Sequence, residues 1–181
     1  MFGGLTNKCA VYIDAANLFY MANQIELRID YGKFKKLFMR RDTKVVWWGY
    51  YTAVDETPDG NRRIQPLLDW LMDKGGYNVV TKMAKSWVQV DGVRKVKGNM
   101  DIEIAIDALR MCQYVDEIVL VTGDGDFTPL VHELQSKGVP VTVVASRQGG
   151  MLATMLRNAA ARVIDLADPE VQSQISAHLA E

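Results

Sequence analysis

Short apolar runs rich in β-branched and aromatic residues alternate along the chain with segments whose apolar residues recur at helical spacing. This alternation is typical of βα units arranged around a mainly parallel sheet. The expected strands cover residues 9–13, 45–51, 77–81, 117–122, 139–145 and 162–165. Residues 119–121 and 139–144 lack polar alternation, which indicates central strands buried on both faces. The pattern therefore predicts a single α/β domain with a mainly parallel central sheet.

The segments between these strands carry apolar stripes, which we interpret as the helix faces that pack against the sheet. The stripes comprise Ile64, Leu67, Leu68, Leu71 and Met72; Ile102, Ala105, Ile106, Leu109 and Cys112; Phe127, Leu130, Val131 and Leu134; and Leu152, Met155 and Leu156. Residues 82–97 instead alternate around Asp91-Gly92, which predicts a β-hairpin inserted between a strand and the next helix. We expect the domain to span 8–165 and to be followed by a surface helix or tail at 166–181.

Acidic side chains stand where the chain leaves the expected sheet. Asp14 directly follows the strand at 9–13, and Asp124 and Asp126 follow the strand at 117–122. Asp101 lies in the first turn of a helix expected to begin near residue 99. Because ligands bind beyond the carboxyl ends of parallel strands, these segments should deliver the four carboxylates to one edge of the sheet.

Clustered carboxylates indicate a hard divalent cation. Carboxylates within about 4–6 Å of one another raise each other's pKa unless a cation lies between them. Oxygen ligands without Cys or His favour Mg²⁺ or Mn²⁺ over zinc. Such an ion can activate water and neutralise phosphate oxygens, which suits hydrolysis of a phosphodiester. Asn17 and Thr122, which stand beside the acidic residues, are expected to orient the ligands, and Thr122 is also a candidate substrate contact.

Some of these acids also suit structural roles. Asp101 could be a simple first-turn acid, and Asp126 could cap the helix that begins near Thr128-Pro129. Asp107 lies six residues past Asp101, about 240° round the helix, so the two do not share a face. We expect Asp107 either to support the site from behind or to be solvated.

Other chemistries are poorly supported. His132 and His178 are the only histidines, and neither is placed to activate a nucleophile at a strand end. Cys9 and Cys112 lie in separate apolar segments without metal-ligand spacing, which indicates buried thiols in a reducing compartment. Neither a signal peptide nor a membrane span is expected, so the sequence predicts a cytoplasmic protein.

The net charge of −1, from 21 basic and 22 acidic residues in a chain of 181, conceals segregated charge. Residues 101–126 hold seven acids against Arg110, whereas 33–44 and 82–97 hold eleven bases against two acids. Basic side chains beside an aromatic ring suit single-stranded nucleic acid, because the ring stacks a base while the cations neutralise phosphates. The hairpin residues expected to bind substrate are Lys85, Trp87, Arg94, Lys95 and Lys97, with Lys97 nearest the acidic site. Both basic segments could also be ordinary solvated faces.

Three motifs in order, YIDAANL, KGNMDIEIAIDAL and VTGDGDF, resemble those of the NYN domain, in particular its LabA-like branch within the PIN-like nuclease superfamily. The resemblance implies a three-layer α/β/α sandwich and a metal-dependent ribonuclease centre. It places the family's acidic ligands at Asp14, Asp101, Asp124 and Asp126, with Asn17 as the polar partner of the first motif.

The sequence thus predicts an endoribonuclease that uses Mg²⁺ or Mn²⁺ and acts on single-stranded or loop RNA. A non-catalytic RNA-binding or regulatory module that keeps the acidic metal pocket is the alternative. A phosphatase or nucleotide hydrolase is a third reading, which would release inorganic phosphate from mononucleotides.

Overall fold

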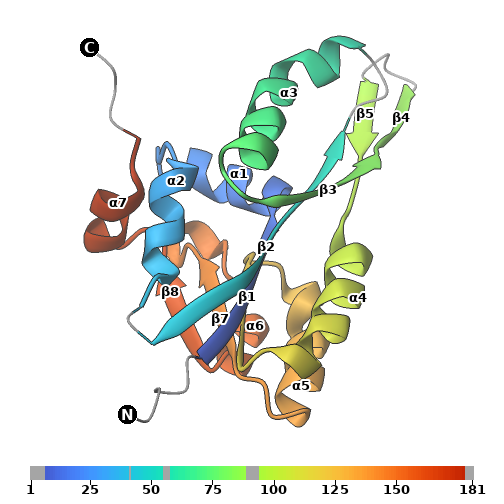
Figure 1. Ribbon diagram of the computed structural model, residues 1–181. Coiled ribbons are helices and arrows are strands. Elements are labelled where there is room, and N and C mark those ends of the chain that lie inside the picture. Colours follow the sequence, from blue (N-terminus) through green and yellow to red (C-terminus); the bar gives the residue numbers. More distant parts are fainter. Residues whose placement is uncertain (1–6, 41, 55–57, 89–93, 178–181) are drawn as a thin grey trace.

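Six parallel strands form the central sheet of the protein (Figure 1). The computed structural model describes residues 7–40, 42–54, 58–88 and 94–177, with backbone alone at 58–61, 85–88 and 94–97. The strands are β1 (Asn7–Asp14), β2 (Thr43–Val54), β3 (Asn78–Met83), β6 (Glu117–Val121), β7 (Val141–Ala145) and β8 (Arg162–Asp165). Their order across the sheet is β3-β2-β1-β6-β7-β8, and all six expected strands are present.

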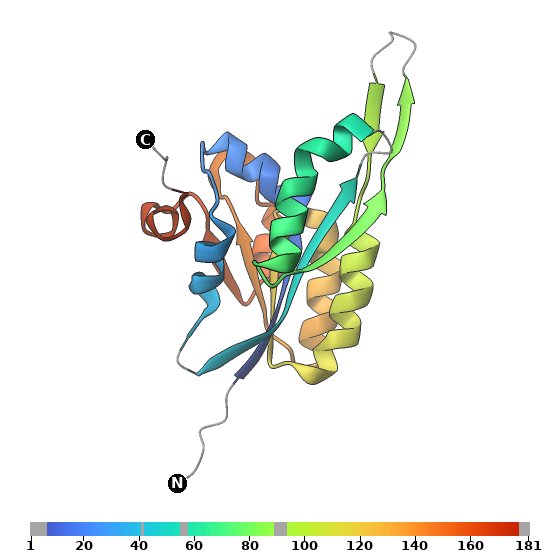
Figure 2. The ribbon, with the colours of Figure 1, turned by 45° about the horizontal axis from the view of Figure 1, so that its top comes forward.

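Helices cover both faces of the sheet, which confirms the expected α/β sandwich. One face carries α1 (Ala15–Gln24), α2 (Tyr31–Phe34) and α3 (Pro58–Asp73), and the other carries α4 (Asp101–Met111), α5 (Thr128–Ser136) and α6 (Thr154–Ala159) (Figure 2). The last helix, α7 (Pro169–Ile175), packs beside α2 and fully buries Ile175. None of the helices in the described residues is long and apolar enough to cross a membrane.

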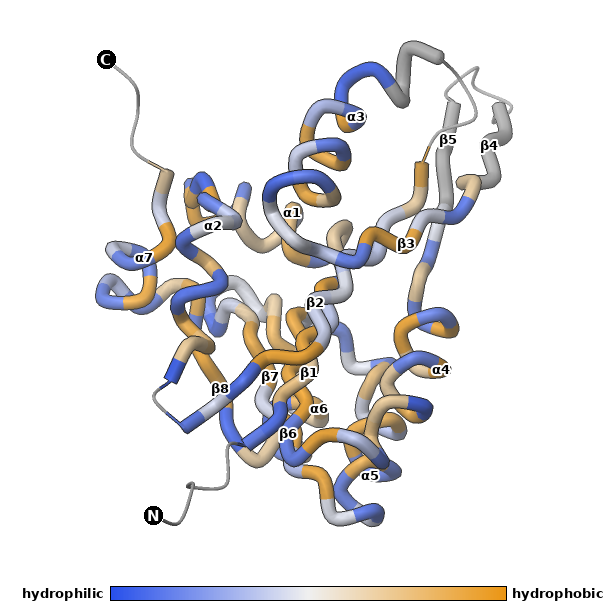
Figure 3. The backbone as a smooth tube through the Cα atoms, viewed as in Figure 1, coloured by the Kyte–Doolittle hydropathy of each residue, from blue (hydrophilic) through white to orange (hydrophobic). Residues whose placement is uncertain are grey.

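The central strands are covered on both faces, as their uninterrupted apolar runs indicate. All five residues of β7 are buried, and so are the last four residues of β6. Figure 3 shows these strands as an apolar centre within a more polar outer layer. The two cysteines, Cys9 and Cys112, are buried free thiols, as expected from their apolar surroundings.

The stripe assigned to the core on α4 is wrong in part. Ile102, Ile106 and Leu109 are 69%, 44% and 37% exposed, whereas Ile104 and Ala108 are buried. This helix is apolar on more than one side, so periodicity alone does not say which side meets the sheet. The small side chain of Ala108 lets the helix approach closely, and packing against β1 selects that face.

Two further stripe residues, Met72 on α3 and Met155 on α6, are also exposed.

The inserted hairpin is formed by β4 (Lys85–Val88) and β5 (Arg94–Lys97), which pair antiparallel. Trp87 pairs with Lys95, and Lys85 pairs with Lys97. Figure 2 shows the hairpin projecting away from the sheet. The expected turn residues, Asp91 and Gly92, lie outside the described part of the chain. The hairpin leads through residues 98–100 directly into α4, so it stands next to the segment that carries Asp101.

Candidate metal centre

The carboxyl ends of β1 and β6 meet at the point where the strand order reverses. From β1 the chain builds outward to β2 and β3, and from β6 it builds outward in the opposite direction to β7 and β8. The loops that leave two such neighbouring strands separate and open a crevice, which is where open parallel sheets bind ligands. Asp14 is the last residue of β1, and Thr122, Gly123 and Asp124 directly follow β6.

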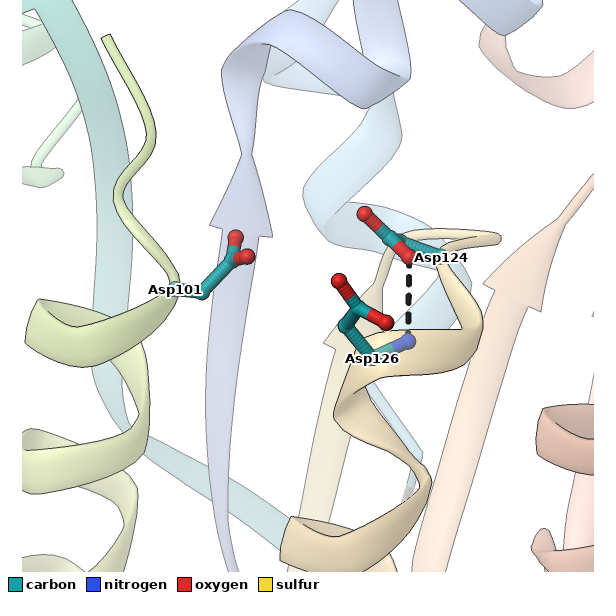
Figure 4. Close-up of side chains that lie close together, drawn as sticks. All are labelled: Asp101, Asp124 and Asp126. Atoms are coloured by element: carbon teal, nitrogen blue, oxygen red, sulfur yellow. Dashed lines mark hydrogen bonds between the residues drawn. The ribbon is translucent and has the colours of Figure 1, made fainter.

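Three carboxylates converge at this crevice from two chain segments. Asp101 comes from the first turn of α4, and Asp124 and Asp126 come from the loop between β6 and α5 (Figure 4). One oxygen of each lies within 4.8 Å of the others. Asp101 and Asp124 are half-buried and Asp126 is exposed. The loop is held in shape because the Asp126 N–H donates to Asp124 Oδ1 at 3.0 Å.

Asp14 lies in the same cavity but outside this group of three. The cavity has a volume of about 300 Å³ and is lined by Asp14, Asn17, Tyr20, Asp101 and Asp124, among others. The pKa of Asp14 is raised to about 6, chiefly because the carboxyl is buried and also because the charges of Asp101 and Asp124 lie nearby. Asp14 accepts the N–H of Asn17 at 3.2 Å, which caps α1. The Asp14 carboxylate therefore lies close enough for the acidic group to raise its pKa, but it is not one of the three close ligands.

We expect Asp14→Asn to stabilise the metal-free protein at pH 7.5. The raised pKa means that, between about pH 4 and 6, the folded state holds more protons than the unfolded state, so stability falls as the pH rises through that window. After allowance for solvent screening, the remaining cost at pH 7.5 is about 1 kcal/mol. Asn caps a helix as well as Asp does, so the variant removes this cost without losing the cap.

Urea unfolding in EDTA at pH 7.5 and pH 4 measures this effect. The gain of the variant over the wild type should be present at pH 7.5 and absent at pH 4. An equal gain at both pH values would contradict the explanation, because it would not come from the charge of Asp14.

Asn99 fixes the position of Asp101, and the sequence reading did not assign it a role. Its side-chain amide donates to Asp101 Oδ2 at 2.6 Å, and its Oδ1 accepts the Asp101 N–H at 2.7 Å. The pKa of Asp101 is raised, mainly by burial, and the charges of Asp124 and Asp126 act in the same direction. The available signal was an Asn two residues before an acid at a helix start, a pattern of local side-chain capping.

Asn17 and Thr122 join the segments of the site by hydrogen bonds. Asn17 Oδ1 accepts the Gly123 N–H at 3.0 Å, which ties α1 to the loop after β6. The Thr122 hydroxyl donates to Asp14 Oδ2 at 3.4 Å and accepts the Asp124 N–H at 3.2 Å. Because Thr122 is only 1% exposed, we expect it to position the carboxylates and not to touch a substrate.

Asp107 stands behind the site and reaches it through a tyrosine. The Tyr51 hydroxyl, from β2, donates to Asp107 Oδ2 at 2.8 Å, and Tyr51 lines the acidic cavity. Asp107 also lies 3.8 Å from the guanidinium of Arg110. Its geometry therefore agrees with a supporting role, exercised through Tyr51.

The basic segments divide into two kinds. Lys33 donates to the Ser176 carbonyl at 2.9 Å, and the Lys35 ammonium lies over the rings of Trp48 and Tyr77, so these cations stabilise the fold. Part of the basic segment at 33–44 is thus structural. The hairpin side chains expected to bind substrate, Lys85, Trp87, Arg94, Lys95 and Lys97, lie outside the described side chains, and their role stays a prediction.

The donor set fits a hard divalent ion. The three close ligand atoms are all carboxylate oxygens, and in the described residues no His or Cys belongs to the group. Oxygen-only ligands are those that Mg²⁺ and Mn²⁺ prefer. The pKa of Asp101 is raised mainly by burial, and the repulsion from Asp124 and Asp126, which adds to the shift, is the part that such an ion would relieve. The choice between the two metals stays a prediction.

A parallel α/β sandwich with an acidic centre at its topological switch point is the fold and site that the resemblance to PIN-like nucleases implies. Residues 8–167 match the NYN domain, so the chain belongs to the NYN domain family, a PIN-like nuclease family. This confirms the resemblance seen in the three motifs.

A curated relative agrees with that membership, and a solved structure shares the fold. The chain is 34% identical over 165 residues to the low amplitude and bright protein LabA of Synechococcus elongatus, an alignment covering 90% of this chain and 85% of LabA. A crystal structure of a Vibrio parahaemolyticus protein of unknown function has a TM-score of 0.72 and 25% identity, covering 93% of this chain and 98% of that one.

Proposed function

We propose that this protein is a metal-dependent endoribonuclease that hydrolyses phosphodiester bonds of single-stranded or loop RNA. The observation that carries the proposal is the convergence of three carboxylate oxygens within 4.8 Å at the switch point of the sheet. Membership of a PIN-like nuclease family supports the same activity. The two buried free cysteines suit a reducing compartment, which supports a cytoplasmic location.

In this proposal Asp101, Asp124 and Asp126 hold Mg²⁺ or Mn²⁺. The ion, when bound, would supply a water of lowered pKa and neutralise charge on a phosphate oxygen. Asn99 holds the Asp101 carboxylate by a hydrogen bond, and Thr122 hydrogen-bonds to both Asp14 and the Asp124 N–H, which fixes their relative positions. Asp14, expected from sequence as a fourth ligand and a catalytic residue, lines the same cavity as Asp101 and Asp124.

The basic hairpin is proposed to hold the RNA backbone. It leads into the segment that carries Asp101, and Gly98, one residue past Lys97, lines the acidic cavity. Lys97 is therefore the residue that we propose to contact phosphate next to the scissile bond. Trp87 is proposed to stack a base, since aromatic rings beside cations suit single strands.

Incubation of the purified protein with a labelled single-stranded RNA tests the proposal. We expect internal fragments with Mn²⁺ or Mg²⁺ and none with EDTA. A thermal melt with the same ions shows whether the site is loaded, because an ion that binds only the folded state raises the melting temperature.

The outcome separates the three readings. A rise in melting temperature without any cleavage of RNA would favour the non-catalytic RNA-binding or regulatory module. Release of inorganic phosphate from mononucleotides, with RNA left intact, would favour the phosphatase. Internal cleavage that depends on the ion supports the endoribonuclease.

A further inference from the structure

A second cavity adjoins the acidic one and has the opposite character. It has a volume of about 410 Å³ and is lined by residues of α1, α2, β2 and α3, on the face of the sheet that these helices cover. Its lining is mostly apolar, and the two cavities share Ala16 and Thr52. A ligand that extends over these two residues would therefore contact both an acidic centre and an apolar surface.

Three aromatic side chains line this second cavity together with two aliphatic ones from α3. Phe19 comes from α1, Tyr31 from the start of α2 and Tyr50 from β2, and α3 contributes Ile64 and Leu67. Phe19 is 68% exposed, so its ring is accessible to a ligand in this cavity. Arg63 adds a cation to the lining.

The floor of the cavity is rigid. The rings of Tyr31 and Tyr50 meet edge to face with centroids 5.6 Å apart, and their hydroxyl oxygens are 3.4 Å apart. The Tyr77 hydroxyl donates to the Tyr31 carbonyl at 2.7 Å, which fixes the start of α2 beneath the cavity. Tyr50 is 3% exposed and cannot easily turn away. The site is thus formed before any ligand arrives, as binding pockets usually are.

We propose that this cavity binds a nucleobase of the nucleic-acid strand whose phosphate lies at the acidic centre. A base is flat, largely apolar on its faces and polar at its edges, and exposed aromatic rings stack such groups regardless of sequence. The shared residues place base and phosphate sites next to each other, and Arg63 supplies a donor for a base edge or a phosphate. The proposal rests on the proposed function, because it takes the acidic centre as the place of the phosphate.

The test uses a set of single-stranded RNA oligomers, each of which lacks the base at one position. Binding of each oligomer is measured by fluorescence anisotropy, and the RNA is checked afterwards to be intact. In the wild type, loss of the base at one position should weaken binding about tenfold. Phe19→Ala should weaken binding of intact RNA by a similar factor and abolish the penalty at that position. Tyr114→Ala, which removes a ring that is 62% exposed outside both cavities, should change neither result.

Two results would overturn the inference. One is an RNA that binds without any position sensitive to base removal. The other is a penalty that Phe19→Ala leaves unchanged, since the cavity would then serve the sugar-phosphate chain or another ligand. An unchanged thermal melt shows that Phe19→Ala is folded. If the wild type cleaves RNA but Phe19→Ala leaves the penalty for base removal unchanged, the base site is refuted and the proposed function stands. If the base site is found but no RNA is cleaved, the proposed function is refuted and the base site stands.

Discussion

Asp124→Asn should lower the rate of metal-dependent RNA cleavage about 10³-fold, because it removes one charged ligand of the three-carboxylate group. The fold should survive, since the Asn side-chain oxygen can still accept the Asp126 N–H that Asp124 accepts now. The measurement is kcat/KM for a labelled RNA at saturating Mn²⁺, together with the Mn²⁺-induced rise in melting temperature. Both should fall in the variant.

Asp69→Asn is the matched control, because Asp69 is an exposed acid on α3 that bonds to the Gln65 side chain away from both cavities. It makes the same change of charge and should leave cleavage within about twofold of the wild type, as surface substitutions usually do. If Asp124→Asn cleaved RNA as well as Asp69→Asn does, the acidic group would not be the catalytic centre.

Gly123→Ala should cost about 3 kcal/mol of folding stability and remove activity with it. A Cβ at this position would lie 1.8 Å from the backbone oxygen of Met151, and the chain there is fixed because the Ala153 N–H donates to the Gly123 carbonyl at 2.9 Å. Backbone atoms have to move, which is more costly than a side-chain adjustment. The Gly123 N–H also bonds to Asn17, so movement would disturb the acidic site.

Gly125→Ala provides the comparison within the same loop. A Cβ there would meet the Ala153 methyl at 3.1 Å, a contact that a shift of a few tenths of an ångström relieves. Urea unfolding of the two variants should show a large loss for Gly123→Ala and a loss below about 1 kcal/mol for Gly125→Ala. Equal losses of stability would mean that the close approach of the Met151 backbone is not the reason why Gly123 is required.

The acidic centre also gives a physical reason for expecting stability and function to oppose each other. The pKa values of Asp14 and Asp101 are both raised, chiefly by burial and also by the repulsion of neighbouring carboxylates, so the folded protein without an ion is less stable at neutral pH for carrying these two charges. Replacing Asp14 is expected to relieve this cost, whereas replacing Asp124 is expected to remove activity. A cation at the three carboxylates would offset the same repulsion.

Local signals in the sequence were sufficient for the elements and for the motif positions. Apolar runs such as 119–121 and 139–144 indicate strands on their own, because a strand buried on both faces is apolar along most of its length. The hairpin between β3 and α4 was likewise predicted from alternation around one turn. The acids at strand ends could be read because parallel strands bring their carboxyl ends to one edge.

The buried face of α4 and the set of carboxylates that converge could be determined only from the tertiary structure. The exposed side of α4, with Ile102 69% exposed, is as apolar as the side that packs, so only the contact with β1 decides between them. The position of Asp14 outside the group of three depends on how the two strand ends lie relative to each other, which no spacing rule contains. The role of Asn99 depends on a turn that places its amide against Asp101.

By itself the sequence determined an α/β protein of the NYN family with acidic residues at its strand ends, because hydrophobic period and strand-end position are local properties. The tertiary structure decided which carboxylates meet, why Gly123 cannot bear a side chain, and that an aromatic cavity adjoins the acidic one. These features arise where β1, β2, β6, α1 and α3, far apart along the chain, are brought side by side. Contacts of that kind are set by packing of the whole sheet and its helices, and no single segment carries them.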